Sequence, residues 1–121
     1  MKRLAFSLLA LLPLQASADV VSYNKCTVSE GKTFADVQAW LTDWRAIAKK
    51  EGVDYEVRLL LPHADTSVSL TTFFLEGSTS SFESYGKAFQ LWYTGAAFRD
   101  SNAQLTAAAS CDGGSVYRTA D

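Results

Sequence analysis

The sequence has few of the residues that most often build reactive centres. It contains one histidine and two cysteines among 121 residues, and neither a CxxC nor an HxxxH spacing occurs. Structural zinc sites usually need four such ligands, and a Ser-His-Asp triad needs a histidine oriented by an acid. Phosphate-binding loops and nucleophile elbows are also missing. The sequence therefore predicts no metal site and no bound cofactor.

Runs of basic residues are missing as well. The chain has 11 basic and 13 acidic residues, and two of the basic residues, Lys2 and Arg3, stand at the N-terminus. Without these two, 9 basic residues face 13 acidic ones, a net charge of −4. An acidic chain with no basic patch argues against binding to nucleic acid or to an anionic membrane surface.

Long apolar runs are confined to the N-terminus. Lys2 and Arg3 precede the run Leu4–Leu12, and Ala16-Ser17-Ala18 follows with the small-x-small form that signal peptidase accepts. The run is too short to span a bilayer and too uniformly apolar for one face of a buried helix. We therefore predict a secretory signal peptide over 1–18 and a single domain over 19–121. The short signal indicates a bacterial protein, exported to the periplasm or secreted.

The two cysteines, Cys26 and Cys111, lie near opposite ends of the predicted mature chain. An even number of cysteines in an exported protein favours a disulfide. Two alternatives remain open, namely two free buried thiols or a metal site. The metal site has only His63 as a further ligand.

Hydrophobic periodicity predicts four strands and two helices. β-branched and aromatic residues alternate in the strands, and apolar residues recur at helical spacing after the capping boxes at Thr33–Asp36 and Ser80–Glu83. The predicted strands cover 20–28, 55–61, 68–75 and 105–111, the helices cover 33–50 and 80–96, and a tail follows from Ser115. The order βαββαβ predicts an α+β, ferredoxin-like sandwich, in which two helices cover one face of a four-stranded antiparallel sheet.

Alternation along the second strand separates its two faces. We expect Tyr55, Val57, Leu59 and Leu61 to face the helices, and Glu56, Arg58 and Leu60 to face away. The third strand has phenylalanine in both alternate sets, and we place Phe73 and Leu75 on the outer face with Leu60. An exposed apolar patch of this size predicts a partner, such as a second copy of the chain.

The element order and the segment SFESYGKAFQLWYTG (81–95) resemble the dimeric α+β barrel superfamily, in particular its antibiotic-biosynthesis-monooxygenase-like members. The resemblance implies a homodimer with sheets packed face to face and a pocket between sheet and helices. It also implies a cofactor-free oxygenase as one possible activity. The chain departs from haem-degrading relatives, which bind iron through a histidine on the second helix, because this helix has none. The cysteine pair and the export signal also differ from the usual cytoplasmic members.

Several residues are candidates for binding a ligand, and each has a simpler structural explanation. Glu56 and Arg58 share a strand face and are typical of an edge strand that resists aggregation. His63 stands in a loop without a catalytic partner. The aromatic stripe of the second helix is typical of a core, but the adjacent pair Trp92-Tyr93 cannot both face inward. The candidate ligand-binding residues are Glu56, Arg58, His63, Phe73, Trp92 and Tyr93.

These features predict a non-enzymatic homodimer that binds a small apolar or aromatic ligand, or a protein partner. The alternative is a cofactor-free monooxygenase-like enzyme acting on a small aromatic or apolar substrate, with Glu56, Arg58 or His63 as polar groups. This alternative requires those residues to open into the pocket. A third possibility is that dimer formation itself is the function, within an envelope assembly.

Overall fold

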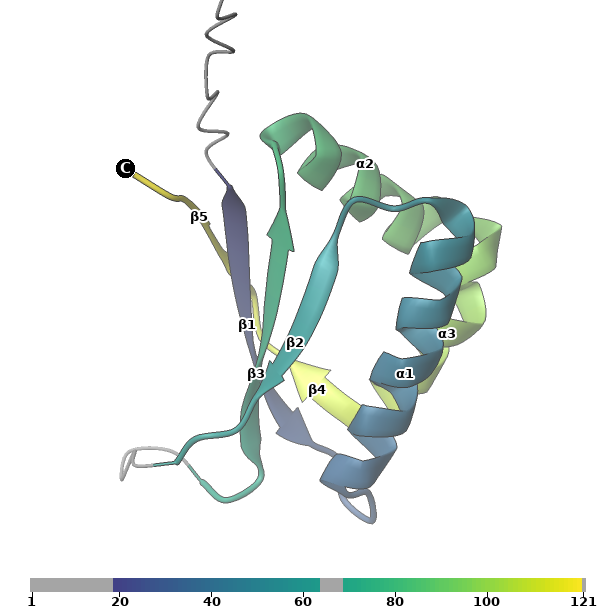
Figure 1. Ribbon diagram of the computed structural model, residues 1–121. Helices are drawn as coiled ribbons and strands as arrows, with labels where there is room; N and C mark the ends of the chain where they lie inside the picture. The colour runs from purple at the N-terminus through teal and green to yellow at the C-terminus, as the bar shows by residue number, and fades with distance from the viewer. Residues whose placement is uncertain (1–18, 64–68, 121) are drawn as a thin grey trace, which may run out of the picture.

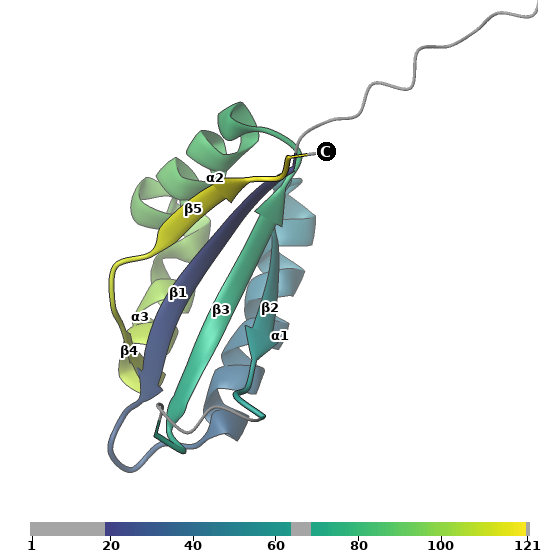
Figure 2. The same cartoon turned by 90° about the vertical axis from the view of Figure 1, so that its left-hand side faces the viewer.

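The computed structural model describes residues 19–63 and 69–120. The predicted signal peptide therefore lies outside the described residues. One antiparallel sheet forms one layer of the fold, and all the helices pack against the same face of this sheet (Figures 1 and 2). The elements are β1 (Val20–Val28), α1 (Phe34–Glu51), β2 (Glu56–Leu60), β3 (Thr72–Thr79), α2 (Phe82–Thr94), the 3-10 helix η1 (Ala96–Phe98), α3 (Arg99–Ala108), β4 (Ala109–Cys111) and β5 (Ser115–Arg118).

The sheet has the order β2-β3-β1-β4, and β5 also pairs with β1. One edge of β1 pairs with β3. The other edge of β1 pairs with β4 and then with β5, which follow each other along it (Figure 2). β4 pairs with Cys26–Val28 and β5 with Val20–Tyr23. The three residues Asp112–Gly114 separate β4 from β5, whereas only two residues separate the paired segments of β1. This extra residue makes a bulge in the sheet edge.

The predicted α+β class is confirmed, but the sheet has five strands, and α3 is an additional helix. The expected strand over 105–111 is wrong for most of its length. Residues up to Ala108 continue α3, and only Ala109–Cys111 form a strand. The reason is the alanine run 107–109, since alanine is the strongest helix former and adds little to a strand.

The third strand is also displaced from its predicted position. It runs from Thr72 to Thr79, whereas we expected it to end at Glu76-Gly77. Pairing with the whole of β1, down to Val20 opposite Thr79, keeps the glycine inside the strand. The start of the predicted strand falls partly on residues outside the described ranges.

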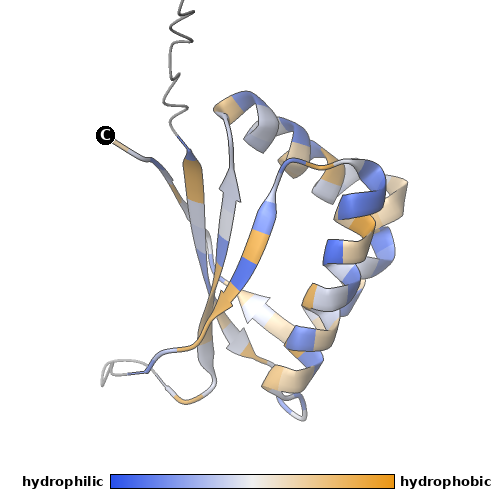
Figure 3. Cartoon of the chain, in the orientation of Figure 1, coloured by the Kyte–Doolittle hydropathy of each residue, from blue (hydrophilic) through white to orange (hydrophobic). Residues whose placement is uncertain are grey.

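The alternation of β2 is confirmed, whereas that of β3 is reversed. Val57 is buried toward the helices, and Glu56, Arg58 and Leu60 face away. Figure 3 shows hydrophilic and hydrophobic positions alternating in the first half of β2. Leu61 is exposed because β2 ends at Leu60. Phe73 and Leu75 are buried under the helices. Strand register leaves Phe74 on the outer face, beside Leu60.

Capping explains where the helices begin. The carboxylate of Asp36 accepts a hydrogen bond from the Thr33 N–H at 2.7 Å, as the predicted capping box requires. Helix α1 ends at Gly52 with a φ of 65°, a conformation that glycine adopts most readily. The second predicted box is wrong, because Ser81 is the N-cap of α2 and accepts from the Ser84 N–H at 3.0 Å.

Cys26 and Cys111 form a disulfide between directly opposite residues of β1 and β4, with 4.0 Å between their Cα atoms. The predicted pairing is therefore confirmed. Such bonds are typical of proteins outside the cytoplasm. No helix in the described part of the chain is long and apolar enough to cross a membrane.

Candidate functional site

A cavity of about 490 Å³ lies between the inner face of the sheet and α2. We call it the α2 cavity. Its volume falls within the range of small-molecule sites, about 300–1,000 Å³. Residues from all five strands, from α1, α2 and α3, and from η1 line it, together with the bulge at Asp112–Gly114. The residues used below are Ser22, Asn24, Trp44, Tyr55, Gly77, Tyr85, Ala88, Phe89, Trp92, Tyr93 and Asp112.

Helix α2 rests on this cavity without burying any residue of its own. None of its residues is fully buried, although its aromatic stripe predicts a core helix. Phe89 is 52% exposed and Tyr93 is 62% exposed. In α1, by contrast, Val37, Trp40 and Trp44 are buried. The apolar face of α2 therefore borders an open volume, and α2 acts as its roof.

Aromatic rings surround the α2 cavity as one connected network. Trp44 contacts Tyr55 with 6.1 Å between ring centroids, and Tyr55 contacts Tyr85 at 6.2 Å. The series continues along α2 through Phe89 to Tyr93, whose rings are 4.6 Å apart. Such tilted and edge-on pairs are favourable aromatic geometries. The exposed faces of these rings can bind a flat apolar ligand.

The floor of the α2 cavity depends on a glycine. Gly77 is paired with Ser22, and a Cβ at position 77 would collide with the phenol of Tyr55. The missing side chain lets the hydroxyl end of the Tyr55 ring approach the backbone of β3 closely. There its hydroxyl is hydrogen bonded to the Ser22 hydroxyl at 2.5 Å. Burial raises the pKa of the Tyr55 phenol, partly offset by this bond with Ser22. Tyr55 is thus a neutral polar group beside an apolar volume.

The bulge between β4 and β5 forms another wall of the α2 cavity. The Asp112 N–H donates to the Lys25 carbonyl at 2.8 Å, which closes the bulge against β1. Any side chain at Gly114 would collide with the Asn24 amide. Cys111 also lines the cavity, so the disulfide ties this wall to the centre of the sheet.

The N-terminal end of α2 is held by a carboxylate. Asp54, just before β2, accepts hydrogen bonds from the hydroxyl and the N–H of Ser80, the latter at 3.4 Å. These bonds, with the Ser80 hydroxyl as the largest cause and Ser84 next, lower the pKa of the Asp54 carboxyl. Asp54 thereby connects the start of the roof helix to the edge strand.

Protonation of Asp54 is expected to weaken its hydrogen bonds with Ser80 at the N-terminal end of α2. Its pKa in the folded protein is below its ordinary value of 3.8. Its contribution to stability is therefore present above that value and lost as the pH falls through the folded pKa. We expect Asp54→Asn to lower the free energy of unfolding by at most about 1 kcal/mol at neutral pH. In urea titrations the difference from wild type should shrink as the pH falls through the folded pKa of Asp54. A constant difference across this range would contradict the assignment.

The predicted site residues divide among three places. Trp92 and Tyr93 line the α2 cavity. Glu56 and Arg58 point to the outer face, and Phe73 lies in the core. His63 is exposed in the loop after β2. Glu56, Arg58 and His63 therefore do not open into the cavity, as the enzyme hypothesis required of them.

Arg58 pairs with Glu76 on the neighbouring strand. The Arg58 Nε donates to the Glu76 carboxylate at 2.9 Å, and this contact is the main cause that lowers the pKa of Glu76. Arg58 thus forms its ion pair with Glu76 on the neighbouring strand, although Glu56 shares its own strand face. Strand register decides it, since Arg58 lies opposite Glu76.

Sequence reasoning missed the residues that shape the cavity floor and wall. Tyr55 was expected to be core, Gly77 was interpreted as a strand end and Asp112 as part of a turn, and Ser22 was assigned no role. The role of Gly77 follows only from its contact with the phenol of Tyr55. That contact depends on the pairing of β1, β2 and β3. No signal in the sequence indicated this contact, because Gly77 was interpreted as the end of the predicted strand over 68–75.

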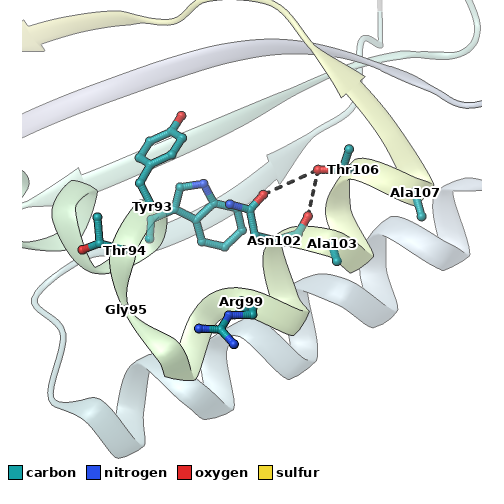
Figure 4. A pocket seen from close by; sticks show the side chains of 9 residues that line it. Tyr93, Thr94, Gly95, Arg99, Asn102, Ala103, Thr106 and Ala107 are labelled. Atoms are coloured by element: carbon teal, nitrogen blue, oxygen red, sulfur yellow. Dashed lines mark hydrogen bonds between the residues drawn. The ribbon is translucent and has the colours of Figure 1, made fainter.

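A second, more open depression of about 560 Å³ lies on the protein surface, between the C-terminal end of α2 and α3. Figure 4 shows Tyr93 and Thr94 on one side and Asn102 and Thr106 on the other. The Thr106 hydroxyl donates to the Asn102 carbonyl at 2.9 Å, so part of its polar lining is already satisfied. Within residues 19–63 and 69–120, no group of three His, Cys, Asp or Glu residues could hold a metal ion.

Comparison with known proteins gives a likeness of fold. No protein-family model matches the chain, and no curated protein matches it. Among solved structures, SnoaB, a cofactor-independent oxygenase from Streptomyces nogalater, superposes with a TM-score of 0.60 at 14% identity. The match covers 86% of this chain and 94% of SnoaB. The chain has the fold of SnoaB.

A second neighbour comes from Bacteroides thetaiotaomicron. It is a conserved protein of unknown function, described as a possible oxidoreductase, with a TM-score of 0.51 at 11% identity. The match covers 86% of this chain and all of the neighbour. These likenesses show the α+β fold alone. At these identities, the activity of the neighbours does not carry over to the chain.

Proposed function

We propose that this protein binds one small apolar or aromatic molecule in the α2 cavity. The observation that carries the proposal is that the aromatic face of α2 buries no residue and instead borders a cavity of about 490 Å³. An apolar cavity with few polar groups is the usual form of a small-molecule site. The Tyr55–Ser22 pair and Asn24 would orient the ligand from the sheet side.

A neutral fluorescent probe tests this proposal. N-phenyl-1-naphthylamine becomes brighter in apolar surroundings, and we expect its emission to rise with saturable binding, one probe for each chain. Ala88→Phe places a ring in the cavity and should abolish the rise. Gln90→Phe adds the same ring to an exposed position of α2 that does not line the cavity. Equal binding by the two variants would place the probe elsewhere and overturn the proposal.

A cofactor-independent oxygenase is the second candidate, favoured by the shared fold with SnoaB over 86% of the chain. Without a cofactor, the substrate itself must reduce oxygen. For example, a ring CH₂ group and O₂ would give a ketone and water. Binding ranks first because the only carboxylate lining the α2 cavity is Asp112, in the bulge. Oxygen consumption with an electron-rich phenolic substrate, lost in Ala88→Phe and kept in Gln90→Phe, would promote the enzyme to first place.

We also propose a homodimer formed through the outer face of a ferredoxin-like sheet. Half-buried Leu60 and Phe74 lie side by side on this face, and Tyr23 and Tyr117 stack edge-on with centroids 5.9 Å apart. Phe74→Glu should convert a dimer into a monomer in light scattering, because it places a charge at the centre of an apolar interface. A wild-type monomer at the same concentration would refute the dimer.

Export to the periplasm or medium remains part of the proposal. The predicted cleavage site precedes Asp19, and β1 begins at Val20. Backbone and side-chain hydrogen bonds then tie Asp19 to Thr119. Intact mass measurement of the exported protein should give a chain that starts at Asp19. A full-length chain retained in the cytoplasm would contradict this part.

A further inference from the structure

The α2 cavity has a distinctive charge pattern. Among the described residues that line it, none is a lysine, an arginine or a histidine, and Asp112 is the only one with a charge. Lys25, Arg45 and Lys87 each adjoin a lining residue in sequence. Lys25 belongs to the alternate set of β1 that faces away from the helices. Arg45 donates to the Val57 carbonyl at 2.8 Å, and Lys87 pairs with Glu83 at 2.9 Å. An anionic ligand would therefore lose its hydration in the cavity without gaining a positive partner.

Asp112 lies at the mouth of the α2 cavity. It is exposed in the bulge, while Tyr93 and Val116, 62% and 41% exposed, border the same opening. Its N–H is used by the Lys25 carbonyl, which fixes the backbone of the bulge. Among the described residues, no hydrogen bond or ion pair involves its carboxylate. Asp112 and the aromatic residues of α2 thus line the same cavity.

Aromatic faces carry negative electrostatic potential and attract cations, by about 0.5–1 kcal/mol at exposed sites. The rings of Phe89 and Tyr93, with 4.6 Å between centroids, reach the mouth from α2. Asp112 approaches from the sheet edge. A positively charged group at this point would meet both, while an apolar body attached to it would lie against Tyr55 and Trp92.

From this arrangement we infer that the α2 cavity prefers cationic aromatic ligands. The ring system would occupy the cavity, and an ammonium group would lie at the mouth between Asp112 and the aromatic rings of α2. This inference rests on the proposed binding function and adds the charge of the ligand to it.

A matched series of naphthalene ligands tests the preference by isothermal titration calorimetry. The members are 2-naphthylmethylamine, a cation at neutral pH, 2-naphthylmethanol, which is neutral, and the anion 2-naphthoate. We expect the amine to bind about three- to ten-fold more tightly than the alcohol, and the naphthoate to bind most weakly. The advantage of the amine should shrink with added salt because the mouth is exposed.

The variant Asp112→Asn should remove most of the advantage of the amine over the alcohol. Asp100→Asn is the matched control, since it makes the same charge change at an exposed position outside the cavity. If the alcohol binds and the amine binds no more tightly, the charge preference is overturned while the binding function stands. If no member binds, the proposed function fails and this inference fails with it.

Discussion

Removing the disulfide between Cys26 and Cys111 is expected to lower the free energy of unfolding by about 4 kcal/mol. The bond closes a loop with a sequence separation of 85 residues, and a loop of this length strongly restricts the unfolded chain. Domains of this size are usually stable by about 5–15 kcal/mol, so the loss is a large fraction of the total. Urea unfolding of the Cys26→Ala/Cys111→Ala variant measures it.

The matched control is Ser110→Ala, at the exposed position next to Cys111 on the same strand. It should change stability by less than about 0.5 kcal/mol. Because Cys111 also lines the α2 cavity, we expect weaker ligand binding in the double variant. A loss of less than about 1 kcal/mol would mean that strand pairing alone holds β4 in place.

Gly77→Ala is expected to destabilise the protein strongly, because this position is packed against Tyr55. The added Cβ would collide with the Tyr55 phenol and lie 2.7 Å from the Ser22 hydroxyl. The Tyr55 ring must then leave its place, and it loses the Ser22 hydrogen bond and the packing against Trp44. We expect a loss of about 2–4 kcal/mol in stability and at least a ten-fold loss in affinity for the neutral probe.

Two comparisons isolate this cause. In a Tyr55→Leu background the phenol is gone, so Gly77→Ala should cost much less than in wild type. Gly86→Ala on α2 meets no atom within 4 Å and should stabilise the helix by about 0.5–1 kcal/mol. If Gly77→Ala were equally harmful with and without Tyr55, the contact between them would not explain the effect.

Much of the fold follows from local patterns in the sequence. The first helix shows a capping box, an apolar stripe and a terminal glycine, and all three agree with the structure. The alternation of β2 and the disulfide were also predictable. The failures occur where local signals are weak. The alanine run before Cys111 favours a helix, and β3 carries phenylalanine in both alternate sets, so periodicity alone could not assign its inner face.

The candidate site was less accessible to sequence reasoning. Trp92 and Tyr93 stood out because adjacent aromatic residues cannot share one helix face, and both line the α2 cavity. Tyr55, Gly77 and Ser22 meet only through the pairing of three strands, a register that no local pattern specifies. That α2 buries no residue is likewise a property of the packing, since its sequence has the stripe of a core helix.

A crystal structure of the protein with N-phenyl-1-naphthylamine tests the central claim most directly. The account predicts one probe molecule between the sheet and α2, in contact with Tyr55 and Trp92. Density for the probe only in the depression beside α3, or only on the outer face of the sheet, would contradict it.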